Sequence, residues 1–297
     1  MLIEGLALGA AFLAGVSSVV ITPVAKQGMA IRLLVVRSGF AALFISAALL
    51  VLPPEIGFGT ITSFGVGVVL FISGPVFALG ALIYYRGLRS LGLARAYPMV
   101  NTFPLFSTLL AVLLLGERPH WLVVVGTMII VLGVWLVAPS ADQAGGRFGF
   151  SADHTTYRWM AIMAGASLLF AISTTANKVA LEAGLSPLLV NLGRTVCAGS
   201  LTMVAGRAWG RSLSLRTLPR MSWALIAISA FVADLVGHYM YFLAMQLGQV
   251  STVVPLAATS PLFVIPMAHV VLKETITWPV AVGTLLTMVG AVLVAVS

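Results

Sequence analysis

Ten apolar stretches, each about 20 residues long, constrain this chain more than any other feature of its sequence. A helix of that length crosses the ~30 Å hydrocarbon core of a bilayer. The runs are continuous rather than alternating, which favours helices over a β-barrel. The sequence therefore predicts an all-α membrane protein. We place its spans at about residues 3–24, 33–52, 62–85, 93–115, 119–138, 158–179, 187–206, 222–245, 250–272 and 276–296.

The composition agrees with a membrane-embedded chain. Of the 297 residues, 60% are hydrophobic and only 8% are charged, whereas a soluble domain carries roughly 25% charged residues. The net charge of +8 comes from basic residues scattered at the ends of spans, which is unlike a nucleic-acid-binding surface. Cys197 is the only cysteine, so the sequence predicts neither a disulfide framework nor a thiolate metal site. We expect the first apolar run to be a retained span, because no basic segment precedes it.

The second half of the chain repeats the first. A shift of 157 residues aligns the two copies, and the matched pairs include Arg37 with Arg194, Pro104 with Pro261, Glu117 with Glu274, Gly126 with Gly283, and Gly133 with Gly290. Each half holds five spans, an odd number, so the second half must enter the membrane in the opposite sense. We predict two inverted five-helix repeats, at residues 1–138 and 158–297, joined by a polar linker at 139–157. Inverted repeats commonly hold a substrate site between them, which favours transport.

The order and duplication of these motifs resemble the EamA-type domain of the drug/metabolite transporter superfamily. The residues that carry the resemblance are Pro104, Gly116-Glu117-Arg118, Trp121, Gly126 and Gly133, with a second copy at Pro261, Lys273-Glu274-Thr275, Gly283 and Gly290. The resemblance implies ten helices around a central cavity. It also implies secondary transport of small metabolites or drugs, without identifying the substrate.

The basic residues predict an orientation as well. If the amino terminus lies outside, most of them fall in cytoplasmic loops, whereas the opposite loops carry Arg118 and Lys178. The positive-inside rule then places both termini outside. We expect a multi-pass protein of the bacterial inner (plasma) membrane.

Asp234 is the most unusual residue for a membrane span, because apolar stretches flank it on both sides. A carboxylate near the bilayer centre costs roughly 2.5–3.5 kcal/mol, so we expect it to face the interior of the bundle. His238 and Tyr241 follow four and seven residues later and share its helical face. An Asp–His pair can exchange a proton near neutral pH, which predicts a substrate-binding or proton-coupling site. The alternative is a structural polar pair that holds this span to a neighbour.

Arg37 and Arg194 are the next candidates, each a turn or two inside its span. They could hold an anionic group of a substrate or pair with Asp234, and their long stems could equally reach the membrane interface. Asp234 corresponds to Ala78 in the first repeat. The carboxylate therefore breaks the symmetry, as a specialised site would.

Further candidates are polar residues in other spans, namely Ser17, Asn101, Thr102, Asn177, Thr259 and Ser260. Such groups can line a polar cavity, and they can equally join helices by hydrogen bonds. The adjacent pairs Asn101–Thr102 and Thr259–Ser260 each lie between two prolines. Prolines free backbone carbonyls within a span and can form both a binding surface and a hinge. Pro98 and Pro104 flank the first pair, and Pro255 and Pro261 flank the second.

We expect a structural role for Glu117 and Glu274, which sit at turns before helices and can bind free amide groups at the start of the helix that follows. The glycines of the fifth span in each half recur at seven-residue spacing, which predicts close helix packing.

Taken together, the residues predict a secondary active transporter, an exporter by the family resemblance, that works by alternating access and uses protons as a candidate coupling ion. No nucleotide-binding G-x-x-x-x-G-K-[ST] run is present, and we predict no cofactor, no metal and no enzymatic activity. The alternatives are a flippase for a lipid-linked group and a non-transporting scaffold. The oligomeric state, a homodimer included, stays open.

Overall fold

The computed structural model describes residues 1–25, 30–53, 59–91, 100, 102–137, 154–209, 219–272 and 278–297. Within these residues the regular secondary structure is helical, apart from one isolated β-bridge between Gly59 and Leu185. Six of the described helical stretches are long and apolar enough to cross a membrane, and four shorter apolar helices accompany them. The predicted ten-helix membrane fold is confirmed.

The helices follow the predicted order of the spans. The first half contains α1 (Leu2–Ala25), α2 (Ala30–Val51), α4 (Ser63–Val68), η1 (Val69–Ser73), α5 (Gly74–Leu91), α7 (Phe103–Leu114) and α8 (Trp121–Val137). The second contains α9 (His154–Glu182), α10 (Pro187–Ala208), α11 (Arg220–Ser229), η3 (Ala230–Gly237), α12 (His238–Leu247), α13 (Val250–Ala257), α14 (Pro261–Leu272) and α15 (Trp278–Ala295). The third and eighth spans each contain a π-helical segment, η1 and η3.

Several helices extend beyond the predicted spans. The third span continues to Leu91 rather than 85, and the sixth runs from His154 to Glu182 rather than from 158 to 179. Hydropathy ends where charged residues begin, but Arg, Lys and Glu are good helix formers and let the helix continue. The ninth span is interrupted instead, since α13 ends at Ala257 and α14 starts at Pro261.

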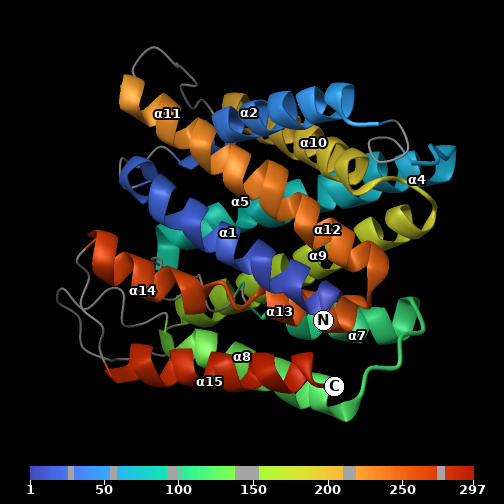
Figure 1. Ribbon diagram of the computed structural model, residues 1–297. Coiled ribbons are helices and arrows are strands. Elements are labelled where there is room, and N and C mark those ends of the chain that lie inside the picture. The colour runs from blue at the N-terminus through green and yellow to red at the C-terminus, as the bar shows by residue number, and fades with distance from the viewer. Residues whose placement is uncertain are drawn as a thin grey trace.

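The two fifth spans, α8 and α15, pack closely at one edge of the bundle (Figure 1). A Cβ added to Gly126 would lie 2.7 Å from the Gly290 carbonyl oxygen, and one added to Gly133 would lie 2.6 Å from that of Gly283. Gly126 therefore faces Gly290 while Gly133 faces Gly283, so the helices cross antiparallel. This arrangement confirms both the predicted packing face and the opposite sense of the two copies.

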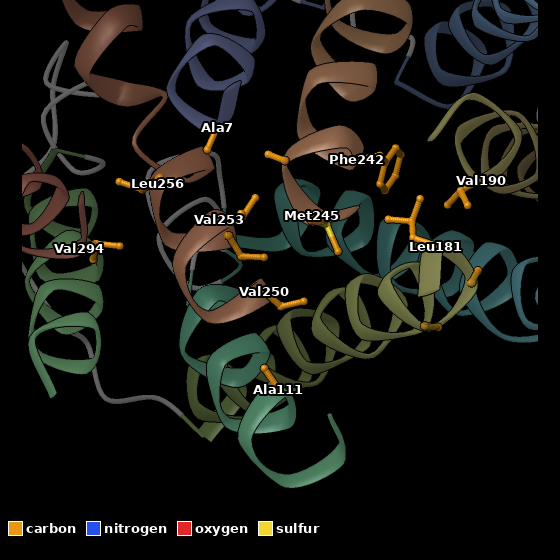
Figure 2. Close-up of a cluster of buried hydrophobic side chains, with 14 of the residues drawn as sticks. Ala7, Ala111, Leu181, Val190, Phe242, Met245, Val250, Val253, Leu256 and Val294 are labelled. Carbon is orange, nitrogen blue, oxygen red and sulfur yellow. The ribbon is translucent and has the colours of Figure 1, made fainter. Parts of the chain in front are cut away.

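The largest cluster of buried apolar side chains joins the two repeats (Figure 2). Ala7 and Ala111 come from the first repeat, and Phe242, Met245 and Val250 come from the second. Large apolar side chains such as those of the end of α2 and the start of α15 are exposed, as expected for surfaces that contact lipid.

Glu117 has a structural role, but the sequence-based expectation about its partner is wrong. Its carboxylate accepts hydrogen bonds from the backbone nitrogens of Val250 (2.7 Å) and Ser251 (3.0 Å), and from the Ser251 hydroxyl (2.6 Å). It thus caps α13 of the opposite repeat rather than the helix that follows it. The physical reason is the antiparallel packing of the repeats, which brings the turn after α7 to the start of α13. Glu274 lies outside the described residues.

Lys178 contacts the end of α12, the helix that precedes α13. Its ammonium group donates to the carbonyl oxygens of Met245 (2.7 Å) and Gly248 (2.9 Å), at the end of α12. A cation thus lies at a helix carboxyl end and the Glu117 carboxylate at a helix amino end, as the helix dipoles favour. The short connection between α12 and α13 is held by charges from two other elements.

Candidate functional site

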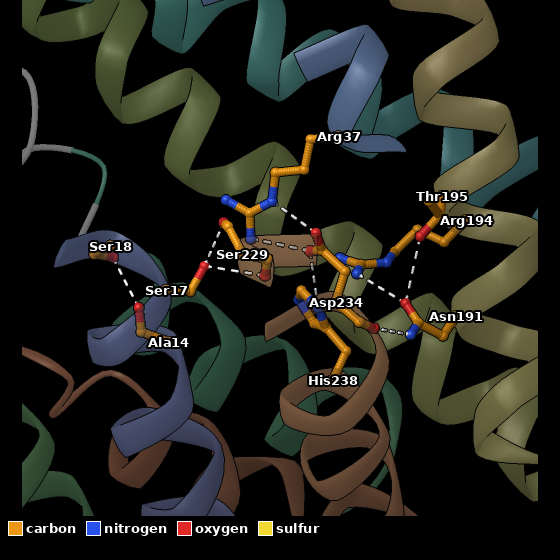
Figure 3. Close-up of polar contacts among 10 residues, drawn as sticks. All are labelled: Ala14, Ser17, Ser18, Arg37, Asn191, Arg194, Thr195, Ser229, Asp234 and His238. Atoms are coloured by element: carbon orange, nitrogen blue, oxygen red, sulfur yellow. Dashed lines mark hydrogen bonds and ion pairs between the residues drawn. The ribbon is translucent and has the colours of Figure 1, made fainter. Parts of the chain in front are cut away.

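Asp234 lies in η3, the π-helical segment of the eighth span, and faces α2 of the first repeat (Figure 3). Its carboxylate accepts two hydrogen bonds from Arg37, from Nε at 2.6 Å and from Nη2 at 3.2 Å. The side chains are 15% and 25% exposed, respectively, so this ion pair is largely shielded. Widened π turns occur frequently at functional sites. The predicted interior position of Asp234 agrees with the structure, and its partner comes from the other repeat.

Asn191 and Arg194 extend this network onto α10. The Asn191 amide donates to the backbone oxygen of Asp234 at 2.5 Å, and its Oδ1 accepts from Arg194 Nη2 at 3.3 Å. The Thr195 hydroxyl lies 3.4 Å from the same Oδ1. Figure 3 shows the Arg194 side chain extending from α10 toward Asp234. Arg194 is 7% exposed, so its side chain is buried within the bundle instead of reaching for the membrane interface.

His238 lies beside Asp234, as the i,i+4 spacing predicts. Its Nδ1 is 3.4 Å from Asp234 Oδ1, within ion-pair distance but without hydrogen-bond geometry. The imidazole ring also stacks near Phe242, with a centroid separation of 6.0 Å. Tyr241 packs against the main buried cluster, and its hydroxyl interacts with Thr174 on α9. Tyr241 therefore links α12 to α9.

Ser17 ties α1 to the base of the π-helical segment. Its hydroxyl lies 2.7 Å from the Ser229 hydroxyl and 3.2 Å from the Ser229 carbonyl oxygen. Both serines are fully buried. The site thus combines residues from α1 and α2 of one repeat with α10, η3 and α12 of the other.

The remaining candidates make hydrogen bonds elsewhere. Asn177 Oδ1 accepts from the Ser73 hydroxyl at 2.5 Å and thereby joins α9 to η1. Thr102 Oγ1 lies 2.9 Å from the Ser167 hydroxyl. These bonds connect helices, which is the structural alternative for polar residues in spans.

The interruption of the ninth span holds the last pair. Thr259 is fully buried and donates to the Leu256 carbonyl oxygen at 2.6 Å. The Ser260 backbone oxygen accepts from the nitrogens of Phe263 and Val264, both at 3.0 Å. Asn101 lies outside the described residues, so its predicted role is not placed.

Sequence reasoning missed Asn191 and Ser229. Asn191 lies one helical turn before Arg194 in an otherwise apolar stretch, which was a usable signal for a buried polar contact. Ser229 carried no signal of its own, because a lone serine in a span commonly bonds to its own helix. The described residues hold no group of three or more metal-ligating side chains.

Comparison with known proteins places this architecture in a family. The model of the EamA-like transporter family matches residues 1–138 and 157–296. A crystal structure aligns with a TM-score of 0.77 at 16% identity, covering 99% of this chain and 96% of the other, which shows a shared fold.

Two relatives carry names that describe a function. A Listeria monocytogenes protein named "Putative sugar uptake protein" is 27% identical over 203 residues, which cover 66% of this chain and 67% of the relative. A Proteus mirabilis protein named "Probable 4-amino-4-deoxy-L-arabinose-phosphoundecaprenol flippase subunit ArnF" is 31% identical over 77 residues, covering 25% of this chain and 58% of the relative. Because the family model matches both halves of the chain, as the sequence motifs predicted, this multi-pass membrane protein belongs to the EamA-like transporter family.

Proposed function

We propose that this transporter is a secondary active carrier that moves a small polar metabolite or drug-like molecule across the bacterial inner membrane. The observation that carries the proposal is the ion pair between Arg37 of the first repeat and Asp234 of the second. Rocking of the two halves in alternating access would change the distance between these side chains. A polar contact of this kind, held between inverted repeats, is suited to respond to a bound substrate.

The transported molecule binds at this site in our proposal. Hydrogen-bond donors and acceptors within the otherwise apolar bundle come from Arg37, Asn191, Arg194, Asp234 and His238. Tyr241 and Phe242 supply aromatic surface next to them. A few polar groups surrounded by apolar side chains are typical of small-molecule sites.

Protons are the coupling ion that the site favours. His238 and Asp234 are adjacent titratable groups at the junction of the repeats. A proton that binds Asp234 would weaken its attraction for Arg37 and so would favour separation of the halves. Export is the direction that the family resemblance suggests.

Transport by the purified protein in liposomes tests the proposal. A panel of sugars, amino acids and organic acids should reveal a molecule whose flux rises with an imposed pH gradient. Asp234→Asn should abolish that flux. Glu182→Gln serves as the matched control, because this acid lies at the end of α9 and its side chain is 55% exposed. If Asp234→Asn transports with normal flux and normal pH dependence, Asp234 is not part of the transport site.

A flippase for a lipid-linked group is the second candidate, and the Proteus mirabilis relative is the observation that favours it. Liposomes that contain a fluorescent lipid with a sugar-phosphate headgroup distinguish the two. Faster movement of that lipid between leaflets, with no flux of soluble molecules, would favour the flippase.

A further inference from the structure

Arg194 is a buried cation to which the described residues offer no carboxylate within bonding distance. Its side chain is 93% shielded, and the hydrogen bond described for its guanidinium goes to the neutral amide of Asn191. Its Nε is buried and has no hydrogen-bond partner among the described residues. A buried donor without an acceptor is costly, and more so when it belongs to a charged group.

Two aromatic rings hold the guanidinium in place. Its Cζ lies 4.6 Å from the centroid of Phe77 on α5 and 5.2 Å from that of Phe242 on α12. The rings come from opposite repeats, so Arg194 is clamped between the two halves. Cation–π contacts stabilise and orient the group, but they leave its charge unneutralised.

The charges of the site do not balance. Arg37 and Arg194 contribute two positive charges, and Asp234 contributes one negative charge, while Arg37 occupies both oxygens of that carboxylate. One positive charge is therefore left over within the described cluster. Buried charges need a partner, because the interior of a membrane protein solvates them poorly.

The symmetry of the repeats shows which partner is missing. Arg37 corresponds to Arg194, and Asp234 corresponds to Ala78. The pair between Arg37 and Asp234 would thus be mirrored by a pair between Arg194 and residue 78. Phe77, the neighbour of Ala78, does contact Arg194, so Arg194 lies against the part of α5 that carries Ala78. The first repeat offers a methyl group there instead of a carboxylate.

We propose that Arg194 binds an anionic group of the transported molecule, a carboxylate or a phosphate, at the place where repeat symmetry would put an acidic side chain. The inference rests on the proposed transport function and narrows its substrate class to anions. A planar guanidinium matches both groups, because its parallel N–H donors can bind two oxygens at once.

Thermal unfolding of the purified protein in a neutral detergent tests the proposal, with sodium phosphate and sodium lactate as probes. Sodium chloride keeps the ionic strength constant, and glucose is the neutral control. Both anions should raise the Tm of the wild type, and glucose should not. Arg194→Gln should remove the response to anions. Equal responses in the wild type and Arg194→Gln, or no response of the wild type to either anion, would overturn the proposal.

Substitution of Ala78 gives an independent arm. Ala78→Asp supplies the missing carboxylate from the protein itself, so it should raise the Tm above that of Ala78→Asn and suppress the response to phosphate and lactate. Ala78→Asn has nearly the same size without the charge, and it should keep the response. An unchanged response in a folded Ala78→Asp variant would contradict the proposed place of the anion.

The anionic group could belong to a soluble molecule or to a lipid headgroup. Nanodiscs of phosphatidylcholine with and without phosphatidylglycerol separate the two sources. Loss of the phosphate response in the presence of phosphatidylglycerol indicates a lipid headgroup, and an unchanged response indicates a soluble anion. If the wild type and Arg194→Gln transport a neutral molecule equally well, the anion site is refuted and the transport function is not. Anion binding without any flux refutes the transport proposal alone.

Discussion

At the scale of single residues, Asp234 and Arg37 determine how the site is held together. The charged groups approach to 2.6 Å, with each side chain mostly shielded. The net stability of such a pair is small, because desolvation offsets attraction, but removal of one partner leaves a shielded charge behind. Single and double substitutions therefore have different effects, and the difference separates a structural pair from a functional one.

We predict that Asp234→Asn lowers the free energy of unfolding by about 3–5 kcal/mol, because it strands the Arg37 charge. The double variant Arg37→Met, Asp234→Leu should recover most of that stability, yet it should not transport. Thermal unfolding and liposome flux measure the two effects separately. Normal flux in the double variant would mean that the pair only holds α2 to η3.

At the scale of helices, the Glu117 carboxylate controls the start of α13. It satisfies two backbone nitrogens that have no partner within their own helix and lies at the positive end of the helix dipole. Because Glu117 belongs to the first repeat and α13 to the second, the cap also ties the repeats together at this end of the molecule.

Loss of this cap should be measurable. We expect Glu117→Gln to reduce the free energy of unfolding by about 0.5–2 kcal/mol, the range for helix caps. Arg118→Gln, an exposed neighbour on the same turn, is the control and should leave the Tm unchanged. Equal Tm values for the two variants would show that the cap adds no stability.

The contact between α8 and α15 depends on the absence of side chains. A Cβ on Gly133 would lie 2.4 Å from Thr287 Oγ1 as well as 2.6 Å from the Gly283 carbonyl oxygen. We predict that Gly133→Ala destabilises the protein by about 1–3 kcal/mol through overpacking. Gly165→Ala on α9 is the matched control, because no atom lies within 4 Å of its added Cβ. A Tm for Gly133→Ala as high as that of the control would contradict the close approach.

At the scale of the whole molecule, the inverted repeats determine on which side of the membrane each helix end lies. Both chain termini lie toward the same end of the bundle, and α11 begins at the other end (Figure 1). Glu117 contacts the start of α13, and Gly248 just before α13 packs against Ile3 near the amino terminus, so the turn after α7 lies at the end where the termini lie. The basic residues predict that this end is outside.

Labelling with a membrane-impermeant maleimide tests this topology. In a Cys197→Ser background, Arg118→Cys and Ser297→Cys should react on intact cells, whereas Arg220→Cys should react only after permeabilisation. All three positions are exposed. Reaction of Arg118→Cys and Arg220→Cys from the same side would contradict an odd number of spans between them.

The sequence by itself determined the membrane class, the ten spans, the duplication and the interior position of Asp234. These signals are local or periodic, because bilayer thickness sets span length and hydrocarbon penalises a carboxylate wherever it stands. The packing of the glycine faces could also be predicted from spacing alone. The boundaries of the two repeats and the linker stay predictions, as do the roles of Asn101 and Glu274, which lie outside the described residues.

Only the tertiary structure decided which partners meet. Nothing in the spacing of Arg37 and Arg194 said which of them would take the Asp234 carboxylate, or that Glu117 would cap a helix 133 residues away. Such contacts depend on how helices from opposite repeats cross, which brings Asp234 of η3 next to Arg37 of α2. These are three-dimensional consequences of packing, and they leave Arg194 as the cation whose counter-charge the described chain does not supply.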